Sequence, residues 1–353
     1  MPYFYAPRTI RFGAGVRHEL PQQLEAFQSK RPLIVTDSWV VSSGAVPNLP
    51  NAIVFSDVQP DPTDVNVAAG IAVFDRHQAD AIVAIGGGSP IDCAKAIRHQ
   101  RPGVPLIAIP TTAGTGSEAT FVMVITDTKD HVKRPVKTPS IMPDAAIVDY
   151  ELTMSMPKPL TAYVGVDTLT HGIEAMVATT ATAMTDPMAE SSIRLTHKHL
   201  RNAWANGADR SAREGMSLAA LQAGMAFGNS STALVHGMSR PMGAVFHIPH
   251  GLSNAVLLPA VTNFSWPGNP DKYAAICGYL EVAPNREALI GYLEKLNNDL
   301  EIPRLRDICP GVEAAFESAL PKMAADALAS GSPQINPKVP SAEEIIELYR
   351  QSW

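Results

Sequence analysis

Cysteine is scarce in this chain. Its three copies among 353 residues, Cys93, Cys277 and Cys309, lie far apart, and no C-x-x-C pair occurs. Such a set forms neither a disulfide framework nor a thiolate metal site, and it is typical of a reducing compartment. We therefore expect a cytoplasmic protein.

Clustered positive charge and long apolar runs are also missing. The chain has 28 Lys and Arg against 34 Asp and Glu, a net charge of −6, with no basic block. Nucleic acid and membranes are therefore not expected as partners. No apolar run has membrane-spanning length, and the first residues lack the pattern of a signal peptide. Hydrophobic residues make up 46% of the chain, enough for a folded protein with two domains.

Short apolar runs alternate with helical patterns in the first half of the chain. This alternation predicts a parallel sheet covered by helices on both faces, in which ligands bind beyond the carboxyl ends of the strands. The fold class is thus an N-terminal α/β domain with a Rossmann-like parallel sheet. The predicted strands are 33–37, 52–58, 80–88, 104–110 and 144–149, and the predicted helices between them include 65–77 and 90–99.

Strand signals end near Pro157-Lys158-Pro159, which marks the expected domain boundary. We predict an α/β domain over 1–157 and an all-α domain over 158–353 that faces the strand ends. Amphipathic helices are expected at 186–205, 211–228, 285–299 and 341–351, the last beginning with a capping box at Ser341 and Glu344.

Two predicted strands end in residues suited to a dinucleotide. Asp37 could bind ribose hydroxyls and repel a 2′-phosphate, or equally cap the next helix. Gly86-Gly87-Gly88, with Ser89 as the expected N-cap, would let a phosphate approach a helix start, although such a turn is often only structural. The turn matches neither G-x-G-x-x-G nor a Walker A loop.

A hydroxyl-rich loop follows the strand at 104–110. Thr111, Thr112 and Thr115 could donate to a phosphate, a ribose or a nicotinamide amide. We expect this loop to open a second helix, in which case Ser117 and Thr120 would be ordinary helix-start residues.

The second half contains a mixed set of nitrogen and oxygen donors. Asp167 and His171 are four residues apart and would project from one helix face. His236 and His250 follow, each before a glycine. Three imidazoles and a carboxylate suit Fe(II), Zn or Ni better than Mg or Ca. The alternatives are a surface Asp–His pair and histidines satisfied within the core.

Seven motifs, in this order and spacing, resemble those of the iron-containing (group III) alcohol dehydrogenase family. They are FGAG (12–15), VTD (35–37), IGGGSPIDCAK (85–95), IPTTAGTGSE (109–118), GVDTLTHGIEA (165–175), LVHGMSRPMGA (234–244) and IPHGLSNAVLLP (248–259). The resemblance implies a dehydroquinate synthase-like architecture, with an α/β domain followed by a helical domain, and a homodimer.

The resemblance also implies site residues. The metal ligands would be Asp167, His171, His236 and His250, holding Fe(II) or alternatively Zn or Ni. The cofactor would be NAD rather than NADP, because of Asp37 at the adenosine ribose. The other cofactor contacts would be Gly87, Gly88 and Ser89 at the pyrophosphate, Thr111, Thr112 and Thr115 near the nicotinamide, and Lys133 and Leu152.

One position departs from the family pattern. Many members have a second histidine four residues after the third ligand, where this chain has Arg240. Arginine cannot accept a proton at working pH, so we expect Arg240 either to pair with an anionic group on the substrate or to form a structural salt bridge. His247 is a candidate proton relay, or else a residue that orients a ligand.

The implied activity is NAD-linked interconversion of a small primary alcohol, diol or hydroxy acid and its aldehyde or ketone. A metal ion would polarise the substrate oxygen, and the nicotinamide would carry the hydride. The alternatives are a maleylacetate reductase-like enzyme with an anionic substrate, a 3-dehydroquinate synthase-like lyase, and a non-catalytic protein that binds nucleotide and metal.

Overall fold

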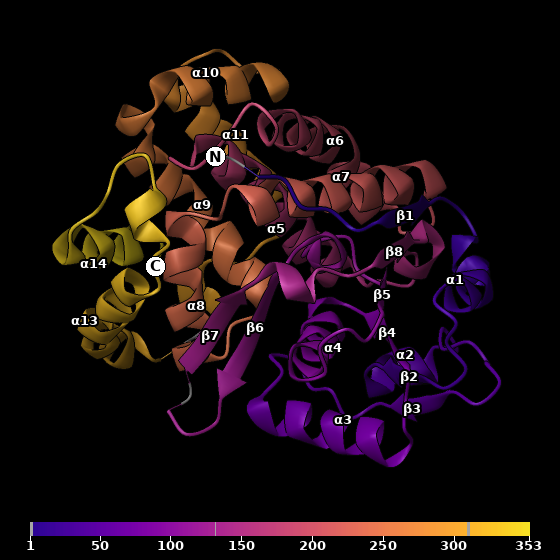
Figure 1. Cartoon of the computed structure of the whole chain (residues 1–353). Helices are drawn as coiled ribbons and strands as arrows, with labels where there is room; N and C mark the ends of the chain where they lie inside the picture. Colours follow the sequence, from indigo (N-terminus) through magenta and orange to yellow (C-terminus); the bar gives the residue numbers. More distant parts are fainter. Residues whose placement is uncertain (1–2, 131, 309–310) are drawn as a thin grey trace. The chain divides into compact units, whose positions relative to one another are not determined.

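A computed structural model describes residues 3–130, 132–308 and 311–353, so Cys309 lies outside the described residues. The chain forms two compact units, Tyr3–Ser155 and Met156–Trp353 (Figure 1). Within the described ranges, no helix combines the length and apolar character that a membrane crossing requires.

The first unit is built on six parallel strands in the order β1-β8-β5-β4-β2-β3. The five predicted strands are confirmed, and a sixth, β1, pairs with β8 at the edge of the sheet. The chain order reverses between β2 and β4, and in sheets of this kind the ligand binds at that switch point. The strands are β1 (Thr9–Phe12), β2 (Pro32–Val35), β3 (Ile53–Phe55), β4 (Ala81–Gly86), β5 (Leu106–Pro110) and β8 (Ala145–Val148).

Helices cover both faces of this sheet because successive strand residues point to opposite sides. On β4, Ile82 and Ala84 join a core with α3 (Asp64–Arg76) and α4 (Gly88–Gln100). Val83 and Ile85 join a second core with α1 (Leu20–Ala26) and α2 (Ser38–Ser42). Both apolar faces of the sheet are thereby buried, so polar residues are expected mainly at the ends of the strands.

The prediction of a second helix after the hydroxyl-rich loop is wrong. A single 3₁₀ turn, η2 (Ser117–Ala119), leads instead into an antiparallel hairpin of β6 (Val122–Asp127) and β7 (Val132–Lys137). β6 is rich in β-branched residues, which favour a strand, and the hairpin packs against α4.

The predicted N-cap at Ser89 is also wrong. The helix α4 begins two residues earlier than predicted, at Gly88, and its N-cap is Gly87, which has no side chain to cap with. Glycine tolerates this position well, so the turn does not need the serine hydroxyl as a cap.

The second unit is helical, as predicted, and α5 lies at its centre. Every residue of α5 from Gly165 to Val177 is buried, and the helix packs against α6, α7 and α9 (Figure 1). The capping box at Ser341 and Glu344 is confirmed. The helices are α5 (Lys158–Val177), α6 (Asp186–Ala205), α7 (Arg210–Asn229), α8 (Leu234–Phe246), α9 (His250–Ser265), α10 (Pro270–Tyr279), α11 (Arg286–Asp299), α12 (Leu305–Ile308), α13 (Glu313–Ala329) and α14 (Ala342–Gln351).

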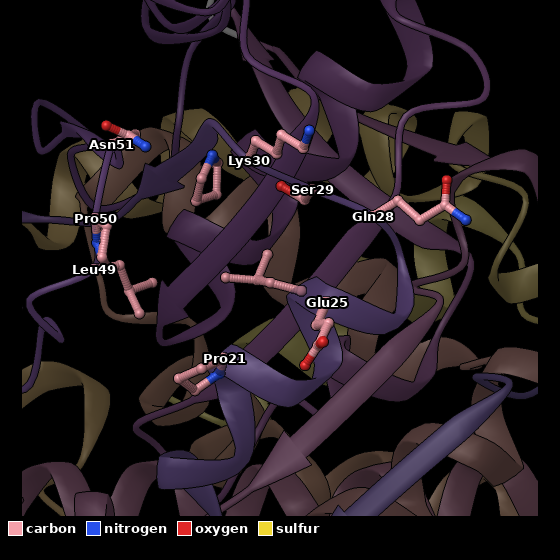
Figure 2. A pocket seen from close by; sticks show the side chains of 10 residues that line it. Pro21, Glu25, Gln28, Ser29, Lys30, Leu49, Pro50 and Asn51 are labelled. Atoms are coloured by element: carbon pink, nitrogen blue, oxygen red, sulfur yellow. The ribbon is translucent and has the colours of Figure 1, made fainter.

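An open pocket of about 630 Å³ lies on the first unit, beside α1 and the amino end of β2 (Figure 2). Its lining includes Glu25, Lys30 and Pro32, and it contains none of the predicted site residues. Because ligands of such sheets bind at the carboxyl ends of the strands, this pocket is not the predicted cofactor site.

Candidate metal and cofactor sites

The helix α5 presents two of the predicted metal ligands on one buried face. Asp167 and His171 are only 2% and 4% exposed, and the carboxylate Oδ1 lies 3.9 Å from the imidazole Nε2. Their i, i+4 spacing places both side chains over the same stretch of helix surface. The ring of His171 is stacked on Phe227 with 4.2 Å between the ring centres, which holds the imidazole in place.

The other two predicted ligands come from α8 and the first residue of α9. His236 Nε2 lies 3.0 Å from His171 Nε2 and 3.5 Å from Asp167 Oδ1. His250 Nε2 lies 3.8 Å from the same carboxylate oxygen. The structure thus brings all four predicted ligands together, although 65 residues separate His171 from His236.

This arrangement fits a divalent cation. Donor atoms about 2.0–2.1 Å from a tetrahedral ion lie roughly 3.3–3.4 Å apart, and the four distances here range from 3.0 to 3.9 Å. Asp167, His171 and His236 also form a buried group of mutually close donor atoms. Three imidazole nitrogens and one carboxylate suit Fe(II), Zn or Ni.

The electrostatics of the site favour the metal-binding protonation states of Asp167 and His171. Burial raises the pKa of Asp167, but the neighbouring His171, His250 and His236 outweigh it and leave the pKa well below its usual range. Burial lowers the pKa of His171 to about 3, against the opposing effect of Asp167. The carboxylate is therefore ionised and this imidazole neutral near pH 7, as metal coordination requires.

Two residues that the sequence reasoning missed support the donors. Glu174 accepts a hydrogen bond from His236 Nδ1 at 2.6 Å, and the Asn254 amide nitrogen donates to Asp167 Oδ1 at 2.6 Å. Such partners orient ligands and tune their basicity. Spacing in the sequence could have identified them. Glu174 follows His171 by three residues and Asn254 follows His250 by four, which places each beside a ligand on its helix.

Two polar atoms at this cluster have no partner within the described part of the chain. They are His171 Nδ1 and Asn254 Oδ1. Buried polar atoms are normally hydrogen-bonded, so the protein alone leaves this site incompletely satisfied.

Asp37 lies just past the carboxyl end of β2, where the predicted ribose site would be. Its Oδ1 accepts a hydrogen bond from Val40 N at 2.8 Å, so Asp37 caps α2. This is one of the two roles considered from the sequence. Capping uses one oxygen of the carboxylate and leaves the other for a second partner.

The glycine turn and the hydroxyl-rich loop lie side by side at the ends of β4 and β5. Thr111 N donates to Gly86 O at 2.9 Å. A Cβ added to Gly87 would lie 3.3 Å from Thr112, and one added to Gly88 would lie 2.9 Å from Thr115. A Cβ at Gly88 would therefore force a shift and one at Gly87 would be tight, so the two predicted cofactor loops lie in close contact.

Lys133 and Ser89 meet at a common neighbour. Lys133 Nζ pairs with Asp61 Oδ1 at 2.7 Å, and Asp61 N donates to Ser89 Oγ at 3.3 Å. The lysine of β7 is thereby brought near the start of α4. Leu152, in the turn after β8, packs partly buried against the core on the α1 side.

A buried charged network supports the hydroxyl-rich loop. Lys95 Nζ donates to Ser117 Oγ at 2.7 Å and to Thr120 Oγ1 at 2.9 Å, and Ser117 Oγ donates to Asp92. Burial lowers the pKa of Lys95 to about 8 and raises that of Glu118 to about 7. Sequence reasoning missed this network, although all its members except Thr120 lie in the two loop motifs.

The two predicted substrate-side residues differ in their surroundings. Arg240 is mostly buried on α8, one turn after His236. His247 is exposed at the C-terminus of α8 with a φ of 55°, and no described residue forms a hydrogen bond with it. Its contacts therefore give no support to the ligand-orienting alternative.

Comparisons with known proteins identify the family of this chain. Residues 7–150 match the iron-containing alcohol dehydrogenase model, and residues 161–353 match the C-terminal model of the same family. The 1,3-propanediol dehydrogenase of Citrobacter freundii is 36% identical over 99% of this chain and 98% of that protein. The NAD-dependent methanol dehydrogenase of Bacillus methanolicus is also 36% identical, over the whole of both chains.

Among solved structures, a 1,3-propanediol oxidoreductase matches with a TM-score of 0.95 and 35% identity, over 100% of both chains. Family, fold and sequence thus agree over the full length of the chain. The chain belongs to the iron-containing alcohol dehydrogenase family and is an oxidoreductase of small alcohols.

Proposed function

We propose that this protein is an Fe(II)- and NAD-dependent dehydrogenase that interconverts a short primary alcohol, diol or hydroxy acid and its carbonyl product. The observation that carries the proposal is the convergence of His171, His236 and His250 on the carboxylate of Asp167. The named activities of the relatives, on 1,3-propanediol and methanol, support a short substrate.

The four converging side chains would hold the metal, with Glu174 fixing the orientation of His236. When bound, the ion supplies Lewis acidity to the substrate oxygen, and the nicotinamide accepts the hydride. The protein's own contribution is to keep Asp167 ionised and His171 neutral, and to bury three of its four donors away from water.

Residues at the carboxyl ends of the strands would bind the dinucleotide. Backbone N–H groups at the start of α4, exposed by Gly87 and Gly88, suit the pyrophosphate. Asp37 would accept hydrogen bonds from the adenosine ribose and repel a 2′-phosphate, which favours NAD over NADP. The remaining assigned contacts are Ser89, Thr111, Thr112, Thr115, Lys133 and Leu152.

We further assign cofactor binding to residues 1–157 and metal and substrate binding to 158–353, in a cytoplasmic homodimer. His247, exposed after α8, would exchange the substrate proton with solvent. An altered pH profile in His247→Ala, with unchanged metal content, is the result this role requires. Unchanged pH dependence would remove the role.

The alternatives differ in what they would do with NAD. A dehydroquinate synthase-like lyase regenerates its cofactor and gives no net NADH, and a non-catalytic protein gives none either. A maleylacetate reductase-like enzyme would consume NADH only with its anionic substrate. The relatives' alcohol dehydrogenase activities favour the first proposal.

The direct test is NADH formation by the iron-loaded protein with short alcohols and diols. We expect His236→Ala and His250→Ala to lose both bound iron and turnover, because each removes one of four donors. His197→Ala is the control, since this histidine bonds Tyr292 on α11 and lies outside the cluster. Full activity in a metal-free variant would contradict the proposal.

A further inference from the structure

The guanidinium of Arg240 is held beside Thr232, just before the start of α8. Its Nη2 donates to Thr232 Oγ1 at 3.3 Å, eight residues back along the chain. Long side chains of a helix point toward its N-terminus over the preceding turn. Arg240 follows His236 by four residues on α8, so the two side chains leave the same face of that helix.

Two hydroxyls fix the direction of this guanidinium, since Nη1 also donates to Ser332 Oγ at 3.0 Å. The acceptors come from different parts of the second unit, which restrains the side chain at both nitrogens. No described carboxylate lies within 4.0 Å of Arg240. An arginine has five N–H donors. In Arg240 only one on Nη1 and one on Nη2 have acceptors among the described residues.

Arg213, in the same unit, is a buried arginine whose nitrogens are all hydrogen-bonded within the protein. It is 1% exposed, and each of its three nitrogens has an acceptor: Gly207 O, Thr161 Oγ1 and Met156 O. Burial lowers the pKa of Arg213 and also that of Arg240, where Glu174 opposes the shift. Arg240 is thus a partly exposed cation whose remaining donors are open to solvent or to a ligand, unlike those of Arg213.

The charges around the site point to the sign of that ligand. The nearby carboxylates of Asp167 and Glu174 would balance a divalent metal ion. Glu174 is already bonded to His236 Nδ1 and Val235 N, both at 2.6 Å. Glu174 favours the charged form of Arg240 from a distance, but its carboxylate is engaged by His236 and Val235, and an anion would give Arg240 a direct partner.

We propose that Arg240 is a specificity-determining residue that binds an anionic group at the far end of the substrate, so that the preferred alcohol is a short hydroxy acid. The planar guanidinium fork matches a carboxylate or another oxyanion. Residues four apart on a helix have Cβ atoms about 5–6 Å apart. The reacting oxygen and the anion would accordingly lie at opposite ends of a chain of a few carbons. This inference rests on the proposed function.

The first experiment compares matched pairs on the iron-loaded enzyme with NAD. The pairs are 3-hydroxypropanoate against 1-propanol and 4-hydroxybutanoate against 1-butanol. Because hydrogen bonds to charged groups contribute about 1.5–3 kcal/mol, we expect kcat/KM to favour the acids by about 10- to 100-fold. Two further substrates, 2-hydroxyethanesulfonate and 2-hydroxyethylphosphonate, distinguish a carboxylate from other oxyanions. Equal use of acid and alcohol in both pairs would overturn the inference.

Substitution of Arg240 tests the residue itself. In Arg240→Gln, kcat/KM for the preferred acid should fall by about 10- to 100-fold, while the matched alcohol changes less than about threefold. Arg240→Lys keeps the positive charge but not the planar guanidinium, so its kcat/KM for the acid should lie between those of the wild type and Arg240→Gln. Arg213→Lys is the control for a purely structural loss, and it should lower Tm without changing the preference. A parallel fall for acid and alcohol in both Arg240 variants would contradict the proposal.

A binding measurement remains available if neither Arg240 variant folds. Butanoate, which has no hydroxyl to oxidise, should raise the Tm of the iron- and NADH-loaded wild-type protein, and neutral butanamide should not. Equal shifts with the two compounds would contradict the inference. Oxidation of neutral alcohols without any preference for acids would refute only this inference, whereas failure to oxidise any alcohol or acid would refute the proposed function as well.

Discussion

Glu174 of α5 accepts a hydrogen bond from Nδ1 of His236 on α8, with 2.6 Å between the two atoms. The other carboxylate oxygen accepts from Val235 N, also at 2.6 Å. Because Nδ1 carries the donated proton, Nε2 is the free nitrogen of the neutral ring, and it faces His171 and Asp167. This one carboxylate therefore sets both the tautomer and the direction of a predicted metal ligand.

Replacing this carboxylate should weaken metal binding. In Glu174→Gln we expect iron affinity to fall about 10- to 100-fold, the usual effect of losing such a partner. The measurement is the rate of iron loss during dialysis against a chelator, at matched protein stability. Glu190→Gln is the control, because Glu190 pairs with Arg194 on the exposed face of α6. Iron retention equal to that of the wild type would show that Glu174 is not needed to orient the ligand.

Gly86 should not tolerate a side chain. Its φ is 152°, and an added Cβ would lie 2.5 Å from the ring of Pro90. We expect Gly86→Ala to lower the free energy of unfolding by about 1–3 kcal/mol, measured by chemical denaturation. At Gly278, in the last turn of α10, nothing beyond its own helix backbone and chain neighbours lies within 4 Å of an added Cβ. Gly278→Ala should therefore be neutral or stabilising by up to about 1 kcal/mol. Equal destabilisation at both positions would refute this explanation.

The two roles of Asp37 can be separated by Asp37→Asn. Asparagine caps a helix as well as aspartate does, so Tm should stay unchanged, whereas the negative charge is lost. We expect the preference for NAD over NADP, measured as the ratio of kcat/KM values, to fall about tenfold or more.

Asp37→Ala serves as the comparison, since it removes the cap as well and should cost about 1 kcal/mol of stability. If Asp37→Asn keeps the wild-type cofactor preference, Asp37 is a helix cap and nothing more.

Glu118 should make stability depend on pH. Burial raises its pKa from an ordinary 4.5 to about 7, so the folded state binds this proton more tightly than the unfolded chain does. The stability that Glu118 contributes is then full below about pH 4.5 and is lost as the pH rises through 7.

In Glu118→Gln, which mimics the protonated form, this loss should disappear. The free energy of unfolding of the variant relative to the wild type should rise by about 2–3 kcal/mol between pH 4.5 and pH 8. Glu294→Gln, at an exposed position on α11, is the control. A constant difference across this pH range would show that Glu118 does not titrate there.

Much of the fold could be predicted because most of the apolar patterns are compatible with only one type of secondary structure. β2, β4 and β5 are buried on both faces, and their continuous β-branched runs reflect this burial. The hairpin was missed because β7 reads VKRPVK, whose charges and proline obscure the alternation expected of a strand. β1 (TIRF) is a short edge strand with equally weak signals.

The candidate site was only partly predictable. A spacing of four residues was enough to place Asp167 and His171 on one helix face. The approach of His236 and His250 to that face depends on the packing of α8 and α9 against α5, and spacing along the chain does not encode it. Donor chemistry and the family resemblance, rather than spacing along the chain, therefore relate these two histidines to the pair on α5.

X-ray absorption spectroscopy at the iron edge tests the central claim most directly. For the iron-loaded wild-type protein we expect three imidazole nitrogens and one carboxylate oxygen at about 2.0–2.2 Å. In His250→Ala, one imidazole should be lost from the spectrum of any iron that remains. An iron environment without imidazole, or one unchanged in both His236→Ala and His250→Ala, would contradict the account.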